Sequence, residues 1–495
     1  MSGPMRRHAR RNRVLALVLG AALVVSSALA GCSLKHIGAP MATVPHTTIF
    51  VQGPLDTVSH IVHLYWFGSE ANGYIAGYEI RMLNPATPAD TSWGYTTRTD
   101  SIFTIQTPNG FISTKFEARA IDEHGVRDPN PAVQTFNFRN IPPIVKLVGK
   151  PNHGDLSDTT FASVTVTWTA TDIDGDATKV RPLIWLDGRR QSPEQVPLGL
   201  TSFTLPSSDF LVNGAYTTGP RTLYIQGIDD GGMAGAIDSV TWYVKKPVTG
   251  SRARLLLIDE VPTSYGAKAR VDTLYNNTVV RAGLTPDQYS VLHLQFDQPF
   301  RSPQDLTQTF QLFETVVWYH GEQTGISPVM MQYGDGIAPY LDSRGKVFLE
   351  SLNLIQYGST GGQLQPYFLN QYLNCGGLFQ YPQPPDSSAS WSYAATQVIE
   401  CPVLGDSLQN GRIIGGMRGF SVDPTEQLIV APANTLSPMN SVPMALAVYA
   451  KQPGGGVFIA DTYPMVSATI STANFPQRSS AVLLEIFGLL GLTGP

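Results

Sequence analysis

Apolar and polar residues alternate in short runs between about residues 45 and 142, as they do in half-buried β-strands. Examples of these runs are His63–Trp66, Tyr78–Arg81, Ile102–Ile105 and Lys115–Ala120. Gly, Asn and Pro residues separate the runs, which is typical of turns between antiparallel strands. The pattern predicts a small β-sandwich over residues 45–142.

The next segment, residues 143–247, repeats this pattern. Val164–Trp168 parallels Val62–Trp66, and Leu223–Gly232 parallels Phe116–Gly125. Self-similarity of this extent indicates two tandem copies of one module, so we expect a second β-sandwich here.

Both segments resemble fibronectin type III and related immunoglobulin-like modules of bacterial surface proteins. The resemblance is carried by Trp66, Gly73–Glu79, Trp93 and Ala120–Gly125. It implies a spacer as readily as a binding module, because this fold does not determine function.

After Pro247, continuous apolar strands alternate with helical segments. The predicted elements are strands at Arg254–Asp259, Ser290–Leu294, Thr315–Tyr319, Lys346–Glu350 and Gly456–Ala460, and helices at Ala267–Ala282, Asp305–Phe313, before Gly345 and at Ser479–Leu490. Continuous apolar strands are typical of a buried parallel sheet. The fold class is therefore two all-β sandwich modules followed by an α/β doubly wound parallel-sheet domain at residues 252–495.

The α/β segment resembles the class I glutamine amidotransferase-like, flavodoxin-type fold. Leu256–Asp259, Val316–Gly321 and Tyr340–Leu349 carry this resemblance. An active member of that family needs a cysteine on the turn after a strand, with a histidine beside it. The corresponding turn, Glu350–Leu352, contains no cysteine, so the resemblance implies a domain without the family's nucleophile.

Ser351 on this turn is an alternative nucleophile, with His320 as its base and Glu322 or Glu350 as the orienting acid. His320 follows a predicted parallel strand, where α/β sheets place their sites. Asp461–Pro464 lacks the family's later histidine. Cys375 or Cys401 as nucleophile is a further alternative, although neither lies on an obvious strand-to-helix turn.

The N-terminus has the pattern of an export signal. Five arginines precede an uncharged run, Val14–Ala30, whose 17 residues are few for a membrane span. Leu29–Cys32 resembles the lipobox of bacterial lipoproteins, which implies cleavage after residue 31, acylation of Cys32 and a tether over residues 32–44. Ser33 is similar to the outer-membrane sorting pattern, so we expect a protein anchored in the cell envelope by lipid, on its periplasmic or surface face.

Charge and cysteine content restrict the possible partners. Without residues 1–31, which hold five of the 33 basic residues, 28 basic residues face 38 acidic ones, and the formal charge of −10 argues against nucleic acid. An oxidising compartment favours a disulfide between Cys375 and Cys401, the alternative being two buried thiols.

Asp172, Asp174 and Asp176 place three carboxylates at alternate positions, which suits a calcium loop, although Asp-Gly-Asp is also ordinary turn chemistry. No cofactor is required, and Ca²⁺ is the one candidate ion. The tryptophans on alternating strands are expected in the core rather than on a sugar-stacking platform; they are Trp66, Trp93, Trp168, Trp185 and Trp242.

The sequence thus predicts a membrane-anchored envelope protein, non-catalytic, that binds a protein or glycan partner. The alternative is a hydrolase or amidase that acts through the α/β domain.

Overall fold

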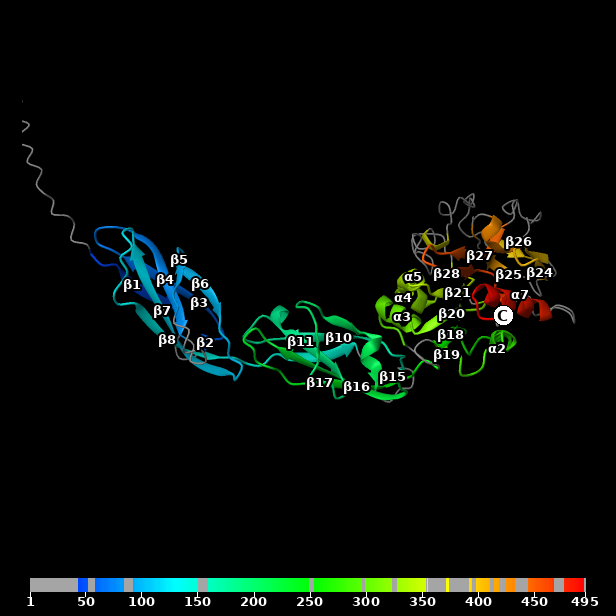
Figure 1. Ribbon diagram of the computed structural model, residues 1–495, viewed down its shortest axis with the longest axis horizontal. Helices are drawn as coiled ribbons and strands as arrows, with labels where there is room; N and C mark the ends of the chain where they lie inside the picture. Colours follow the sequence, from blue (N-terminus) through cyan, green and yellow to red (C-terminus); the bar gives the residue numbers. More distant parts are fainter. Residues whose placement is uncertain are drawn as a thin grey trace, which may run out of the picture. The chain divides into compact units, whose positions relative to one another are not determined.

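The chain folds into two compact units, residues 1–141 and residues 142–495 (Figure 1). The computed structural model describes residues 43–51, 58–83, 92–149, 159–248, 253–295, 299–322, 327–352, 354, 371–373, 391–393, 398–409, 414–417, 420, 424–431, 444–466 and 476–493. In these ranges, no helix is both long and apolar enough to cross a membrane.

The first unit contains a two-sheet sandwich. One sheet has the order β1 (His46–Val51), β3 (Ile61–Ser69), β6 (Asp100–Thr104), and the other has the order β2 (Val58–Ser59), β8 (Ala132–Arg139), β7 (Phe111–Asp122), β4 (Ile75–Leu83), β5 (Gly94–Thr96). Trp66 on the central strand β3 is fully buried, and its ring contacts those of Tyr78, Phe103 and Phe116. Because apolar and polar residues alternate along these strands, the apolar face of each strand packs into the core of this unit.

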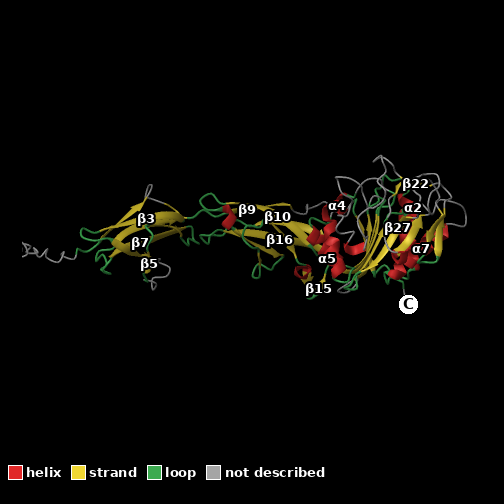
Figure 2. Ribbon diagram, turned by 90° about the horizontal axis from the view of Figure 1, so that it is seen from above, coloured by secondary structure: helices red, strands yellow, loops and turns green. Residues whose placement is uncertain are grey.

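The second sandwich, in the second unit, has the same plan (Figure 2). Its sheets have the orders β9 (Ile144–Gly149), β10 (Val164–Thr171), β13 (Ser202–Leu205) and β12 (Glu194–Gln195), β11 (Arg181–Leu186), β16 (Gly219–Ile228), β17 (Asp238–Val244), with β14 (Leu211–Val212) and β15 (Ala215–Tyr216) as a separate hairpin. Trp168 on β10 occupies the buried place that Trp66 has on β3. The strand orders of the two sandwiches thus follow the repeat in the sequence.

The rest of the second unit is built on a nine-stranded sheet. Its order is β19 (Tyr289–His293), β18 (Ala253–Asp259), β20 (Phe313–Tyr319), β21 (Lys346–Glu350), β28 (Val457–Asp461), β27 (Met444–Lys451), β26 (Gln427–Ala431), β23 (Val398–Cys401), β24 (Asp406–Gln409). The first five strands pair in parallel, and the others pair antiparallel. The sheet is mixed, whereas the sequence predicted a parallel one. The turn between Lys451 and Val457 is too short for a parallel crossover, so β27 and β28 pair as an antiparallel hairpin.

Helices cover both faces of the parallel strands. α2 (Lys268–Arg281) and α7 (Pro476–Leu489) bury apolar side chains in the core on one face, and α3 (Pro303–Phe310), α4 (Pro328–Tyr333) and α5 (Ile337–Asp342) do so on the other. Helix α2 ends just before Gly283, whose φ of +78° lets the amides of Gly283 and Leu284 satisfy the last carbonyls. This is the helix end that the sequence predicts.

The second sandwich and the α/β part share one hydrophobic core. The rings of Phe161 and Phe313 meet edge to face with centroids 5.3 Å apart. Beside them, Asp305 of α3 accepts hydrogen bonds from the Ser163 hydroxyl (2.5 Å) and the Thr165 amide (3.2 Å). The Thr165 and Ser302 hydroxyls lie 2.6 Å apart. We call these contacts the sandwich–α3 joint.

Asp305 is fully buried in this joint, and burial raises the pKa of its carboxyl to about 6, although the Ser163 hydroxyl and the backbone amides act to lower it. A buried carboxyl with satisfied oxygens fixes the geometry of the groups that bind it, because each unmade bond would cost about 1–3 kcal/mol. The second sandwich is therefore held to the α/β part by specific contacts.

Candidate functional site

Polar side chains gather where the parallel strands end. In register, Asp259 on β18 stands beside His293 on β19 and Tyr319 on β20, and Glu350 on β21 stands beside Asp461 on β28. The connections reverse direction between β18 and β20, and such a reversal places ligands at the carboxyl ends of the strands. We call this set the carboxyl edge.

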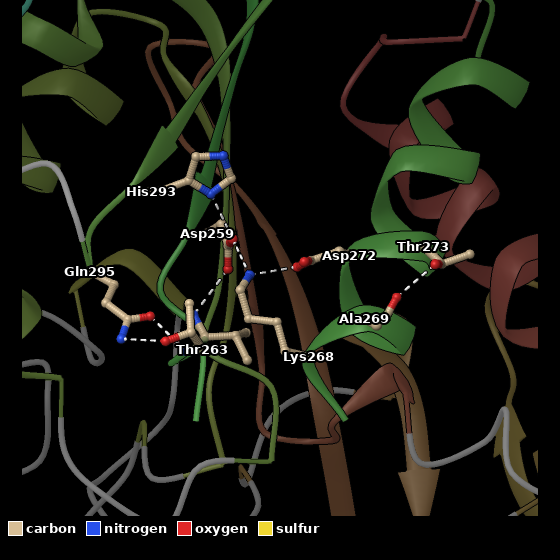
Figure 3. A network of polar contacts seen from close by, with 9 residues as sticks. Asp259, Thr263, Lys268, Ala269, Asp272, Thr273, His293 and Gln295 are labelled. Carbon is tan, nitrogen blue, oxygen red and sulfur yellow. Dashed lines mark hydrogen bonds and ion pairs between the residues drawn. The ribbon is translucent and has the colours of Figure 1, made fainter. Parts of the chain in front are cut away.

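Asp259 is the centre of a network at one end of this edge (Figure 3). Its buried carboxylate accepts a hydrogen bond from the Lys268 ammonium (2.5 Å), and Nδ1 of His293 lies 2.8 Å from the same oxygen. Lys268 also donates to Asp272 at 2.8 Å. Burial acts to raise the pKa of Asp259, but the bonds from His293 and Lys268 hold it below its ordinary value, so Asp259 is a carboxylate.

The His293 side chain is 49% exposed, and its second ring nitrogen points away from Asp259 (Figure 3). A carboxylate that binds one imidazole nitrogen fixes the orientation of the ring. Next to this pair, Gln295 donates to the Thr263 hydroxyl and accepts from the Thr263 amide, so the side chain of Gln295 closes on the loop after β18.

Glu260 follows Asp259 but lies in the interior. Trp318 Nε1 donates to its carboxyl group at 2.8 Å, and the Ser327 hydroxyl donates at 2.5 Å. Burial raises the pKa of Glu260 to about 7 despite these bonds. Nearby, the Tyr265 hydroxyl donates to Glu322, so Glu322 binds the loop after β18.

Ser351 and His320, the predicted nucleophile and base, do come together. His320 Nδ1 lies 3.4 Å from the Ser351 hydroxyl oxygen, a long separation for a bond of this type. Both side chains are buried, and burial lowers the pKa of His320 to about 4. The pair is neutral, and the Ser351 side chain has no exposed surface in this state.

Glu350, one of the two acids expected to orient His320, binds elsewhere. Its carboxyl accepts from the Tyr275 hydroxyl at 2.6 Å and from the Met465 amide at 3.1 Å. Burial raises the pKa of Glu350 to about 7, and burial together with the neighbouring Glu350 raises that of Asp461. Glu350 and Asp461 are thus the buried acids of the carboxyl edge.

Two of the three carboxylates of the predicted calcium loop have different partners. Asp172 accepts a bond of 3.4 Å from the Asp174 amide, and burial, with Asp174 beside it, raises the pKa of Asp172. Asp176 instead caps a short 3₁₀ helix by accepting from the amide and hydroxyl of Thr178. In the described ranges no set of three His, Cys, Asp or Glu side chains is arranged to hold a metal, and calcium stays a prediction.

Other predicted sites have mixed outcomes. Cys401 is buried at the end of β23, while Cys32 and Cys375 lie outside the described residues, so acylation and the disulfide stay predictions. Trp93, expected in the core, is only half-buried, and the guanidinium carbons of Arg81 and Arg119 each lie 4.2 Å from the centroid of its ring. The other tryptophans expected in the core are buried, as the alternation predicts; they are Trp66, Trp168, Trp185 and Trp242.

Asp259 and His293 were not predicted from the sequence as a pair. A signal exists, since both residues end apolar strands, but their contact depends on the parallel register of β18 and β19. The sequence did not predict that β18 and β19 are neighbours in this register, so it did not indicate the contact between Asp259 and His293.

Matches to known proteins come from solved structures. No protein-family model matches the chain, and no curated protein matches its sequence. Among solved structures, the fibronectin(III)-like modules of Clostridium thermocellum CbhA match at 18% identity over 41% of this chain and 95% of that one, with a TM-score of 0.19. The FN1–FN3 domains of chicken CNTN1 match at 13% identity over 44% and 68%, with a TM-score of 0.17. TM-scores this low support no argument about the fold, so the description of both sandwiches rests on their own strand pairing.

Proposed function

We propose that this protein is a lipid-anchored component of the bacterial cell envelope whose α/β part is a non-catalytic domain that binds a protein or glycan. The observation that carries this is the burial of Ser351. The residue at the turn where amidotransferase-like domains have their nucleophile has no exposed surface, and its neutral partner His320 is 3.4 Å away.

The state of the acids around this pair supports the same proposal. Glu350 is bound by Tyr275, and Asp259 is bound by Lys268. Glu260 is likewise bound by buried donors. Acids bound in this way stabilise a fixed shape, whereas a general base needs access to a substrate proton. These three acids are therefore occupied by the protein's own groups, which favours a non-catalytic role for them.

The anchor is proposed from the N-terminal sequence. The signal of residues 1–31 and the lipobox cysteine, Cys32, are expected to place the mature chain outside the cytoplasm, and Ser33 favours the outer membrane. Replacing Cys32 by Ala should release the protein from washed membranes, whereas the control Ser33→Ala should stay in the membrane fraction. An unchanged membrane fraction in Cys32→Ala would contradict the anchor.

A serine-directed fluorophosphonate probe tests whether the α/β domain is non-catalytic. We expect no labelling of the wild-type chain and the same result for Ser351→Ala. Labelling that disappears in both Ser351→Ala and His320→Ala, but persists in a control at an exposed serine, Ser192→Ala, would show an active serine and overturn the proposal.

One observation favours a hydrolase as the second candidate. The His293–Asp259 pair has a half-exposed imidazole oriented by a buried carboxylate, which is the arrangement of a general base that activates water. Turnover of p-nitrophenyl esters or amides that is lost in both His293→Ala and Asp259→Asn, with unchanged melting temperatures, would support this candidate.

A further inference from the structure

The five-stranded sheet of the first sandwich has an outer face that is rich in basic side chains. Along β7, alternate residues point into the core, so that Lys115, Glu117 and Arg119 point outward. Glu79 on β4 pairs in register with Arg119, and Arg127, in the loop after β7, binds the same glutamate at 3.0 Å. We define the basic face by its five cationic residues: Arg81, Lys115, Arg119, Arg127 and Arg139.

Charge is divided unequally between this face and the rest of the first unit. Two acids, Glu79 and Glu117, lie among the five basic residues, so the face has a formal charge of +3. The other described residues of the unit include one arginine and five acids, a formal charge of −4. The first unit therefore has one positive side, although its described part is negative as a whole.

The cations of the basic face lie further out than its acids. The Glu79 side chain is 13% exposed, whereas the Arg127 side chain that binds it is 52% exposed. Lys115 and Arg139 are also exposed, and neither forms an ion pair with a described residue. The guanidinium and ammonium groups are thus the first charges that an approaching partner meets.

Trp93 gives this face a fixed arrangement. The guanidinium carbons of Arg81 and Arg119 each lie 4.2 Å from the centroid of the Trp93 ring. Contact with the ring restricts both side chains in the absence of any partner. An anionic partner therefore meets cations that are already ordered, which lowers the entropic cost of binding them.

The second sandwich shows that the fold itself does not require these charges. Leu223 on β16 corresponds to Phe116 on β7 in the sequence repeat. The outward residues beside Leu223 are uncharged; they are Thr222, Tyr224 and Gln226. They take the places of the charged residues of β7. The basic face is thus a property of the first sandwich alone, which is the folded part closest in sequence to the expected anchor.

We infer that the basic face binds the anionic headgroups of the membrane that carries the protein. This inference rests on the proposed lipid anchor. Cys32 precedes the first described residue, Thr43, by 11 residues, which span at most about 40 Å when extended. The first sandwich thus stays near the bilayer, where anionic headgroups attract Lys and Arg side chains. Its remaining, acidic surface is repelled, so the basic face turns toward the membrane.

Exposed apolar residues beside the cations favour a lipid surface over a soluble anionic glycan. Phe111 is 57% exposed and stands in register opposite Arg139. Tyr95, which is 62% exposed, stands opposite Glu79. The boundary between headgroups and acyl chains accommodates both kinds of side chain, since phosphates lie next to apolar chains there. A soluble polyanion would leave the apolar residues in water.

Flotation of the chain from Ser33 onward with lipid vesicles, at low salt, tests the inference. We expect binding to vesicles of phosphatidylcholine mixed with phosphatidylglycerol, no binding to pure phosphatidylcholine, and release as salt is added. The double variant Lys115→Gln, Arg139→Gln should bind about 30-fold more weakly. The control Lys146→Gln, Arg181→Gln removes two exposed cations from the second sandwich and should bind as the wild type does.

Circular dichroism melting establishes that each variant is folded. Absence of binding to the mixed vesicles, equal binding to pure phosphatidylcholine, or an equal loss in the control would overturn the inference. Binding of dextran sulfate without binding of vesicles would also overturn it, since the face would then serve an anionic glycan. Because this chain lacks Cys32, its failure to bind vesicles would leave the proposed anchor unaffected.

Discussion

The two sandwiches share their strand order and their central tryptophan but differ in what covers them. Among the described residues, the core of the first is made only of its own side chains, while that of the second continues into the α/β part. At equivalent positions of β3 and β10, the first sandwich has His63 on an exposed face, and the second has Thr165 in a buried joint. A repeat in the sequence therefore yields one separate module and one that is part of a larger folding unit.

The largest expected effect comes from a matched pair of tryptophan variants. Trp66→Ala should cost the first unit about 4 kcal/mol, because it removes a fully buried ring, and it should leave the second unit unchanged. Trp168→Ala should destabilise the second sandwich and the α/β part together. Hydrogen exchange measured by mass spectrometry, peptide by peptide, separates the two units. Faster exchange confined to the second sandwich in Trp168→Ala would show that the second sandwich and the α/β part do not unfold together.

The sandwich–α3 joint provides the next effect. Asp305→Ala leaves the Ser163 hydroxyl and the Thr165 amide without their acceptor, which should cost about 3 kcal/mol in the second unit alone. Asp305→Asn keeps the shape and one acceptor, so its loss should be smaller. Urea unfolding followed by the same exchange method measures both, and equal stability of Asp305→Ala and wild type would contradict a specific joint.

The pH dependence should also differ between the units. Burial raises the pKa of Glu260 and Glu350 to about 7 and that of Asp305 to about 6, and all three lie in the second unit. An acid whose pKa is higher in the folded chain than in the unfolded chain stabilises the fold as it takes up its proton. The unfolding free energy of the second unit should therefore rise as the pH falls from about 8 to about 6, by roughly 2 kcal/mol.

Two groups limit the pH range over which the two units should differ in this way. His320, with a pKa lowered to about 4, opposes the trend below about pH 6.5, because the unfolded chain then binds the proton more readily. In the first unit, the bond from Arg127 lowers the pKa of Glu79 against the effect of burial, so its contribution is lost only at acidic pH. Thermal melting across pH tests this, and a parallel rise in both units would count against it.

The smallest effect concerns calcium in the second sandwich. At ten times its dissociation constant, bound Ca²⁺ would stabilise the second unit by about 1.4 kcal/mol. Asp172→Asn should remove this gain, whereas Asp176→Asn should retain most of it, because Asp176 is occupied by Thr178. Calorimetric titration gives the measurement, and a gain that survives in Asp172→Asn would place the ion elsewhere.

Much of this fold could be predicted from local patterns. The repeat around Trp66 and Trp168, the helix that ends before Gly283 and the apolar strands of the parallel sheet are each visible in short stretches of sequence. The antiparallel strands β23, β24, β26 and β27 were missed, because β23, β24 and β26 have only four or five residues each and no period identifies them.

The site and the joint depend on contacts between distant residues. The proximity of Ser351 and His320 could be predicted, since both follow parallel strands, but their burial could not be read from the sequence. Asp305 looks like an ordinary acid in the first turn of a helix, and its acceptor role toward Ser163 depends on how a sandwich packs on α3. Contacts between modules produce no hydrophobic periodicity in the sequence, so the sequence does not indicate them.

Differential scanning calorimetry of the chain from Ser33 onward tests the central claim most directly. We predict two transitions, one for the first sandwich and a larger one in which the second sandwich and the α/β part unfold together. Asp305→Ala should lower only the larger one. A third transition for the second sandwich in the wild type, or its melting together with the first, would contradict the account.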